Sequence, residues 1–276
     1  MAWWFAGVAV ARPEALRGTT VADWLGPLPD GAREVAAALV RVATYAHAPE
    51  ALDAGATLAQ VQRALHGVDY LDGGWQRLVD ALAEAARAAG ATITLGAAVR
   101  EVRPRQVVTD AGRLDCDAVV LAVGPHVAAA LTGSRALAEI AARTLPVTAA
   151  CLDVALAGPL DPARRFALGV DRPLYVATHS DVAAELAPPG ASVVHAALYG
   201  GGERDELEAA LDALHPGWRG RVVRARWMPD LVVAHDLPRA AVHGRRAPHE
   251  VDGFHLAGDW VGDEGMLADA AVASAD

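Results

Sequence analysis

Apolar side chains recur at helical spacing between residues 14 and 70. Thr19 and Thr20 place hydroxyl caps in front of the first apolar stretch, and the prolines that follow it end the helix. We predict two further helices, over 31–45 and 58–65, from apolar residues that return every three or four positions. The stripe predicted for the first of these consists of Val35, Leu39, Val42 and Tyr45.

A longer amphipathic pattern follows the pair Gly73 and Gly74 and ends at Gly90, a residue suited to the position just after a helix. Its apolar positions include Leu78 and Leu82. Short strands are predicted over 91–95, 98–102 and 106–109, with a turn at 110–112. The continuous apolar run at 117–125 is typical of a strand buried in a parallel sheet.

Between residues 128 and 240 the pattern changes to alternating strands with a few helices. This alternation favours an antiparallel sheet flanked by helices. Gly200, Gly201 and Gly202 follow a strand but lack the spacing of a phosphate loop, so we predict an ordinary loop there. The predicted strands are 146–156, 165–170, 174–178, 192–199 and 221–228, and the helices lie around Leu137 and over 203–214.

The last two dozen residues, 253–276, carry the most specific pattern: a short strand that stops at Gly258 and Asp259, a glycine turn, and an alanine-rich helix that begins near Gly265. Such an ending brings one carboxylate, bare backbone and helix N–H groups to one place. It suits the polar part of a cofactor. The alternative is a buried strand and a capped helix, with Asp259 only ending the strand.

Composition narrows the function classes. The chain has 276 residues, 53% hydrophobic and 21% charged, enough for one large domain or two interleaved ones. Its net charge of −10 argues against nucleic acid as a partner. All 24 basic residues are arginine. The absence of lysine excludes Schiff-base chemistry and a P-loop.

The sequence contains little that indicates a hydrolase or a metal-binding site. No serine lies in a Gly-x-Ser-x-Gly elbow, and Cys116 and Cys151 form no Cys-x-x-Cys pair. His179 and His195 can approach each other across neighbouring strands, with Asp181 nearby, yet ordinary core or surface histidines are the favoured interpretation. We predict no metal site, and we place the protein in the cytoplasm.

No apolar run reaches the 18 residues that a membrane span requires. Residues 1–10 are apolar and aromatic but short. We favour a buried helix start over an aromatic patch at a membrane interface, and peripheral membrane contact stays open.

The segment 253–276 closely resembles the C-terminal flavin-binding motif of the FAD-dependent amine oxidase and phytoene desaturase superfamily, in which a Gly-Asp pair precedes a Gly-x-x-x-Ala-type helix. The resemblance implies that Gly258 and Asp259 bind the ribityl and pyrophosphate region of FAD. It also implies that backbone groups of Gly265, Met266 and Leu267 contact the flavin ring.

The stretch from Gly73 to residue 125 resembles a second part of the same superfamily. There a Gly-Gly helix, matched by Gly73 and Gly74, leads to a valine that brackets the adenine, and Val99 is the matching valine. Ala122, Val123 and Gly124 would lie beside the adenosine half of FAD. A generic α/β unit explains the periodicity equally well, but not the occurrence of both segments in this order.

The resemblance implies an α/β fold: a partial FAD-binding Rossmann-like domain, similar to that of glutathione reductase, interleaved with an α+β substrate domain that contains a mostly antiparallel sheet. Residues 1–70 would be the helical part of the substrate domain and 128–240 its sheet and helices. Residues 71–127 and 241–276 would form the FAD-binding domain.

The family begins with a strand, a Gly-x-Gly-x-x-Gly turn and an acidic residue, and none of this occurs before residue 70. The resemblance therefore implies a chain truncated at its N-terminus, or a βαβ unit on another chain. Apolar strand edges near residues 119–123 are then expected to be exposed, and tight FAD binding by this chain alone is not expected.

The function implied is that of an FAD-dependent oxidoreductase of the phytoene desaturase type, which transfers a hydride from a C–H bond of a lipophilic substrate to flavin. Segments 174–180 and 215–218 resemble that subgroup's insertion domain. No side chain is identifiable as a catalytic acid or base. The alternative is a non-catalytic module on the same fold that binds an apolar ligand or a partner protein.

Overall fold

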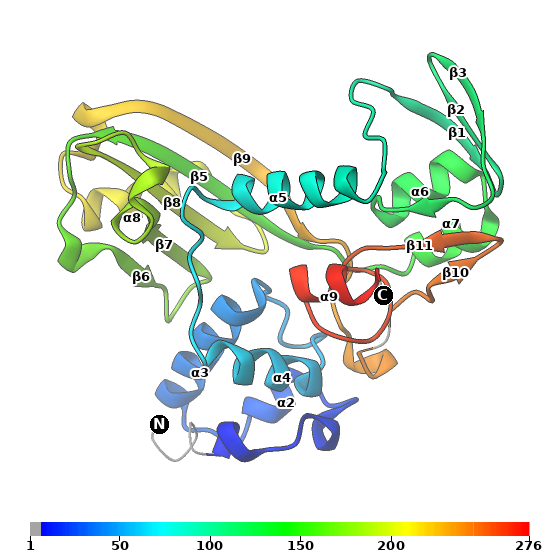
Figure 1. Ribbon diagram of the computed structural model, residues 1–276. Coiled ribbons are helices and arrows are strands. Elements are labelled where there is room, and N and C mark those ends of the chain that lie inside the picture. The colour runs from blue at the N-terminus through cyan, green and yellow to red at the C-terminus, as the bar shows by residue number, and fades with distance from the viewer. Residues whose placement is uncertain (1–6, 245, 276) are drawn as a thin grey trace.

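The computed structural model describes residues 7–244 and 246–275, in three packed regions (Figure 1). The first is a helical body of α2 (Val21–Leu25), α3 (Asp30–Thr44) and α4 (Ala54–Ala64). Thr20 accepts a hydrogen bond from the backbone N–H of Asp23 at 3.0 Å, which confirms the predicted cap. Of the apolar segment 1–10, residues 7–10 are helical; Val8 is buried in this core but Val10 is 81% exposed, and residues 1–6 lie outside the described residues.

Helix α3 buries a different stripe from the predicted one. Ala36, Val40 and Ala43 are buried in the helical core, whereas Val35 and Leu39 are only half-buried. The predicted stripe is therefore wrong by one position around the helix. Alanine side chains on the inner face let the helix backbone pack closely, and the larger residues lie at its flanks.

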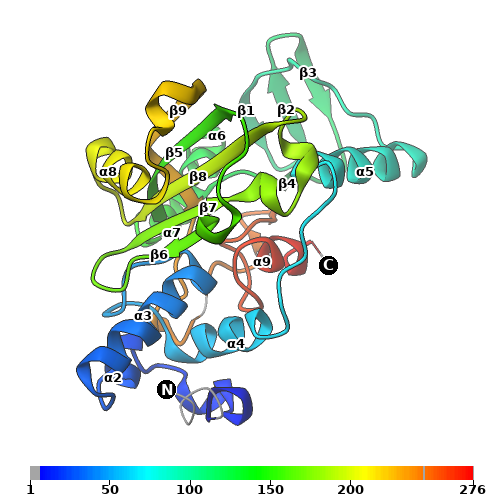
Figure 2. The same cartoon turned by 90° about the vertical axis from the view of Figure 1, so that its left-hand side faces the viewer.

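The second region is an antiparallel sheet in the order β6-β7-β8-β5-β9, as predicted for the insertion (Figures 1 and 2). Helix α8 (Arg204–Leu214) packs on one face, over Leu152, Val154 and Val194. The strands are β5 (Val147–Ala157), β6 (Phe166–Leu168), β7 (Leu174–Thr178), β8 (Ala191–Tyr199) and β9 (Val222–Ala234).

The opposite face of this sheet is covered only at one end. Side chains alternate between the faces of a strand, so Val147, Cys151 and Asp153 of β5 share the face away from α8. Val147 is buried against the helical body, while Cys151 and Asp153 are half-exposed. The sheet thus leaves a partly open face beyond its contact with the helices.

The third region joins the chain's middle and its C-terminus. Strand β4 (Val120–Leu121) pairs in parallel with β11 (Phe254–Leu256), which pairs with β10 (Glu250–Val251). Their core also includes Ala128 of α6 (Pro125–Thr132) and Leu137 of α7 (Arg135–Ala141). The other elements here are β1 (Val99–Arg103), β2 (Gln106–Thr109), β3 (Gly112–Asp115) and α9 (Ala268–Ala273).

Two predicted strands in this region need correction. The run 117–125 forms only the two residues of β4, although the parallel pairing is confirmed. Segment 91–95 forms no strand, and Leu95 is 85% exposed. A strand requires a neighbour to satisfy its backbone groups, and β11 is the only neighbour of β4 among the described residues. As expected, Val120 is exposed, but Val119 and Leu121 are buried.

Helix α5 (Trp75–Ala88) runs between the antiparallel sheet and the β1–β3 hairpins (Figure 1). Gly74 caps its start with φ 77°, and Gly90, with φ 92°, follows its end as predicted. Its apolar positions Leu78 and Leu82 are exposed rather than covered, so the helix presents an apolar stripe to its surroundings.

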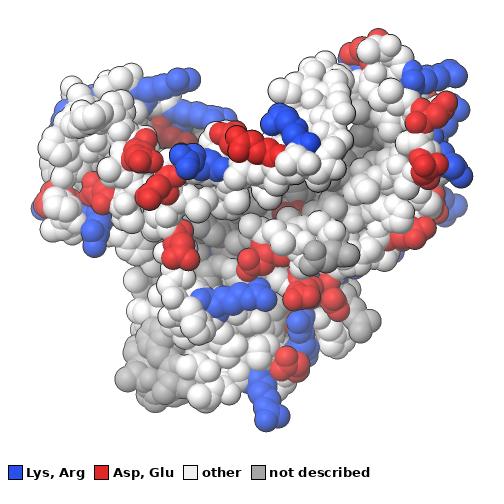
Figure 3. All heavy atoms as spheres, in the orientation of Figure 1, with Lys and Arg blue, Asp and Glu red and all other residues white. Residues whose placement is uncertain are grey.

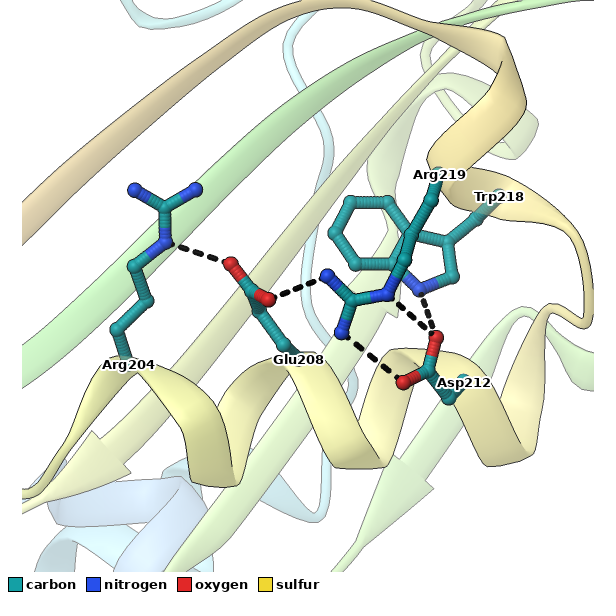
Figure 4. A network of polar contacts seen from close by, with 5 residues as sticks. All are labelled: Arg204, Glu208, Asp212, Trp218 and Arg219. Carbon is teal, nitrogen blue, oxygen red and sulfur yellow. Dashed lines mark hydrogen bonds and ion pairs between the residues drawn. The ribbon is translucent and has the colours of Figure 1, made fainter.

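Charged side chains of both signs are interspersed over the face drawn in Figure 3. A compact example lies on α8, where Arg219 binds Glu208 and Asp212, and Glu208 also binds Arg204 (Figure 4). Asp212 accepts from the indole N–H of buried Trp218 at 2.8 Å. This network ties η5 to α8. The 3-10 helices are η1 (Pro13–Leu16), η2 (Pro162–Arg164), η3 (His179–Asp181), η4 (Ala184–Leu186), η5 (Trp218–Arg221) and η6 (Ala240–Val242).

Candidate flavin site

A pocket of about 350 Å³ lies where the third region meets the end of β9 from the antiparallel sheet. Its wall comes from the end of β4, the end of β9, the residues after β11 and the start of α9, segments far apart in the sequence. The lining residues are Ala122, Val123, Gly124, Val233, His235, Ala257, Gly258, Asp259, Trp260, Leu267, Ala268 and Ala271.

Asp259 is fixed in this pocket by His235. Its carboxylate accepts from the backbone N–H of His235 at 3.1 Å and contacts the ring Nδ1 at 2.9 Å. The Asp259 side chain is 14% exposed. Gly124 lies against the same ring, and a Cβ there would come within 2.5 Å of it. The small residue is what lets the imidazole reach Asp259.

Trp260 and Ser274 join the pocket walls. The Trp260 indole N–H donates to the carbonyl of Val123 at 3.0 Å, across 137 positions of sequence. The backbone N–H of Gly258 donates to Ser274 Oγ at 2.8 Å, which fixes the end of α9 beside the strand that stops at Asp259. The parallel pair β4 and β11 is thereby held at its carboxyl end, where ligands bind in open parallel sheets.

The turn before α9 brings Met266 and Leu267 beside Asp259. These three residues line a smaller adjoining pocket together with Val147 of β5. Leu267 has φ 57° and ψ −129°, a backbone conformation that residues other than glycine rarely adopt. Gly265 lies in the same turn, and its carbonyl accepts from Arg246 at 3.2 Å, in a separate polar pocket with Arg17 and Arg63.

Four of the eleven residues predicted to bind the cofactor line neither the main pocket nor the adjoining one: Gly265, which lies in the pocket with Arg17 and Arg63, and Gly73, Gly74 and Val99. Gly73 and Gly74 pack near Glu185 and Leu186, and Val99 pairs with Thr109 in the hairpin sheet. The structure does bring together Ala122, Val123, Gly124, Gly258, Asp259 and Leu267, with Met266 in the adjoining pocket.

The sequence pattern did not reveal His235, Val233 or Trp260 as pocket residues. Trp260 directly follows the Gly-Asp pair, so its position alone was a usable signal. His235 lies at the end of a long strand with no motif around it. Only the folded chain places it opposite Asp259.

The lining residues suit the sugar and ring parts of a flavin. One nearly buried carboxylate can accept hydrogen bonds from ribityl hydroxyls, and the small residues Gly124, Gly258 and Ala122 admit close approach of a ligand. Val123, Val233 and Leu267 provide apolar surface for a flat ring. Among residues 7–244 and 246–275, no arginine lines this pocket, so these residues offer no guanidinium there for a phosphate group.

The site thus combines a carboxylate at the carboxyl end of a parallel strand pair with a neighbouring antiparallel sheet. The chain belongs to the family of flavin-containing amine oxidoreductases, whose sequence model matches residues 26–276. It is an FAD-dependent oxidoreductase with an α/β fold.

Solved structures share this fold over nearly the whole chain. An oxidoreductase from Methanosarcina mazei is 18% identical with a TM-score of 0.74, over 98% of this chain and 69% of that one. A Pyrococcus furiosus protein is 14% identical with a TM-score of 0.67, over 98% and 70%. A fatty acid isomerase from P. acnes is 12% identical with a TM-score of 0.57, over 97% and 67%. No curated protein sequence matches the chain.

Within 7–244 and 246–275, no three histidine, cysteine, aspartate or glutamate side chains are grouped so as to hold a metal ion. Over the same residues, no helix combines the length and apolar character needed to cross a membrane.

Proposed function

We propose that this chain oxidises a lipophilic small molecule at a C–H bond, in the manner of phytoene desaturases. When bound, FAD accepts the hydride from that bond. The observation that carries the proposal is the convergence of Ala122–Gly124, Gly258–Asp259 and Leu267 on one pocket.

In this proposal Asp259, positioned by His235, accepts hydrogen bonds from the ribityl hydroxyls. Backbone groups at Met266 and Leu267, where α9 begins and its first N–H groups have no intrahelical partners, bind the polar edge of the ring. Ala122, Val123 and Gly124 contact the cofactor from the opposite wall. Gly73, Gly74 and Val99 have a role in cofactor binding only if the ligand extends beyond the pocket.

A lipophilic substrate is supported by the surroundings of the pocket. Val123, Val233 and Leu267 line it, and Val147 continues this apolar surface onto the sheet. A protein of similar fold, from P. acnes, is a fatty acid isomerase. The exposed apolar stripe of α5, including Trp75, Val79 and Leu82, supports peripheral contact with a membrane as the source of such a substrate.

The test is a titration of the 276-residue chain with FAD and with riboflavin, followed by quenching of flavin fluorescence. No Gly-x-Gly-x-x-Gly sequence occurs in the chain, so both ligands should be titrated into the high micromolar range. Asp259→Ala should weaken binding of both by at least about tenfold, because charge-assisted hydrogen bonds are lost. Asp230→Ala, at an exposed position of β9, is the matched control.

Binding of both flavins that is weakened by Asp259→Ala and unchanged by Asp230→Ala supports the proposed site. Failure of the chain to quench either flavin, or equal affinity in the Asp259→Ala variant, would overturn it.

A further inference from the structure

A second pocket, of about 400 Å³, lies between the end of α7, the segment after β9 and the segment before β10. Three arginines line it, Arg143, Arg239 and Arg246, and we refer to it as the arginine pocket. It shares Asp236 and Arg246 with the small pocket beside Asp259, but it shares no lining residue with the main flavin pocket. Its chemistry is therefore separate from that of the flavin site.

The positive charge of the arginine pocket is only partly balanced. Within 7–244 and 246–275, Asp236 is the one acidic residue in its lining. Oδ1 of this buried carboxylate accepts from the backbone N–H of Leu145 at 2.9 Å and lies 3.9 Å from a terminal nitrogen of Arg239, beyond hydrogen-bond distance. Asp259 also acts on the charge of Arg246, but it lines other pockets. Arg143 and Arg239 thus bring two positive charges to a pocket with one carboxylate.

Several N–H donors of these arginines have no acceptor. The Nε atoms of Arg239 and Arg246 are both buried with no hydrogen-bond partner among the described residues. The terminal nitrogens of Arg246 donate instead to the carbonyls of Glu264 and Gly265, at 2.9 and 3.2 Å. Arg143 is exposed, and its side chain has no hydrogen-bond or ion-pair partner in the part of the chain that the structure describes. Buried N–H groups usually have partners, so the pocket suits a ligand rich in acceptors.

The other arginine-lined pocket, which holds Gly265, has a different balance. Its three arginines line the wall together with Asp263 and Glu264, and Arg63 also forms an ion pair with Asp269 at 3.3 Å. Acidic side chains there match the arginines in number. Of the two, the arginine pocket is the better site for an anion.

Apolar residues complete the lining of the arginine pocket. Ile140, Val242 and Ala247 belong to it. Its volume falls within the range of about 300–1,000 Å³ that is typical of sites for small organic ligands. The lining therefore suits an anion that carries an organic group.

We infer that the arginine pocket binds the phosphate group of a small organic phosphate monoester, at a site separate from the flavin pocket. A phosphate monoester carries a charge of about −1.5 to −2 at neutral pH and three strong acceptor oxygens, whereas a carboxylate has one charge and two oxygens. Arginine presents its N–H donors in a planar fork that matches such oxygens. Arg143 and Arg239 bind the phosphate through their guanidinium groups, and Arg246 contributes Nε.

The experiment is a calorimetric titration of the flavin-free, full chain at slightly alkaline pH with phenyl phosphate, inorganic phosphate and benzoate. We expect saturable binding of phenyl phosphate, about tenfold tighter than that of benzoate, which has one charge and one oxygen fewer. Inorganic phosphate should bind about threefold to tenfold more weakly than phenyl phosphate, because it has no apolar part to bury.

Arg143→Gln is the main variant, because the exposed, unpartnered side chain makes no contribution to folding that the substitution would remove. It should weaken the binding of phenyl phosphate by about tenfold, as for one charge-assisted hydrogen bond. Arg239→Gln should have a similar effect. Arg113→Gln, at an exposed position of β3, makes the same change in net charge and should leave the affinity unchanged.

Four results would each overturn the inference: no saturable binding of phenyl phosphate, equal affinity for benzoate, an inorganic phosphate affinity that equals or exceeds that of phenyl phosphate, and unchanged affinity in Arg143→Gln. Loss of binding in Arg63→Gln but not in Arg143→Gln would place the anion in the other pocket and would also overturn it. Riboflavin has no phosphate group, so its binding should be the same in Arg143→Gln and the wild type. The outcome is therefore independent of the flavin titration.

Discussion

The carboxylate of Asp259 binds the backbone and the ring of one residue, His235, 24 positions before it. One carboxylate offers about four acceptor positions, so two remain for a ligand's hydroxyls. The pair couples the end of β9 to the Gly-Asp turn. Changes at β9 therefore reach the flavin pocket through His235.

Gly124→Ala tests this coupling. The added methyl group would come within 2.5 Å of the His235 ring, and the ring must move away from Asp259. Overpacking of this kind costs about 1–3 kcal/mol, so riboflavin affinity should fall by about tenfold in a fluorescence titration. Gly220→Ala, where nothing lies within 4 Å, is the control. Unchanged affinity in Gly124→Ala would show that the ring position does not matter.

Leu267 offers a test of backbone strain. At φ 57° and ψ −129°, glycine is favoured over any residue with a Cβ. Leu267→Gly should therefore be more stable than Leu267→Ala by about 1 kcal/mol in urea unfolding. At Leu65, the residue just after α4, whose φ of −66° is that of a right-handed helix, the order should reverse. An alanine variant at 267 that is the more stable of the two contradicts the strain.

Asp53 holds the helical body together. It is fully buried, caps α4 by accepting from Ala56 N–H at 2.8 Å, and accepts from Gly18 N–H at 2.8 Å. Asp53→Ala strands both donors and should lower the free energy of unfolding by about 2–3 kcal/mol, measured in urea. Asp53→Asn keeps one acceptor oxygen and should cost about half as much. Equal losses for both variants would mean that the second hydrogen bond contributes nothing.

His179 should make stability depend on pH. Burial, with a contribution from His195, lowers its pKa from 6.5 to about 4. The unfolded chain therefore takes up a proton between these values while the folded chain does not, so stability falls as pH drops through this window. His179→Phe should flatten the decline in urea midpoints, whereas His126→Phe should not. Parallel pH profiles for wild type and His179→Phe would refute the assignment.

The polar network of Arg219, Glu208 and Asp212 on α8 should contribute more to the stability of the protein than a single exposed ion pair does. Asp212→Ala removes partners of Arg219 and leaves the indole N–H of buried Trp218 without an acceptor. Glu139→Ala breaks only the exposed pair with Arg135 on α7. The urea midpoint should fall clearly for Asp212→Ala and little for Glu139→Ala. Similar midpoints for the two variants would contradict this.

Sequence pattern located most elements because their signals are local. The cap at Thr20, the helix end at Gly90 and the alternation of β5 and β8 depend on neighbours in the chain, and they were predicted correctly. The strand at 91–95 was wrong because pairing is a property of the surroundings. Its residues have strand propensity, but the described residues offer no strand beside it.

In the candidate site, too, the residues with a local sequence signal were predictable and the contacts between distant segments were not. A Gly-Asp pair at the end of a strand and before a helix indicates a binding turn, so Gly258 and Asp259 were predicted from the sequence. His235 was missed. The approach of His179 to His195 was foreseen, but the contact of His195 with Asp153 was not. The contact of Asp153 with His195 arises from strand register, and that of His235 with Asp259 from the packing of two separate sheets; a single sequence specifies neither.

The indole of Trp260 contributes more to the shape of the flavin pocket than the backbone hydrogen bonds of the adjoining strands do. Because β4 has only two residues, the pocket wall at Val123 is held in place by the hydrogen bond from the Trp260 indole. The width of the flavin pocket thus depends on the ring of Trp260. Because Trp260 is also fully buried in the hydrophobic core of this region, a smaller residue at position 260 would alter that core and the pocket wall together.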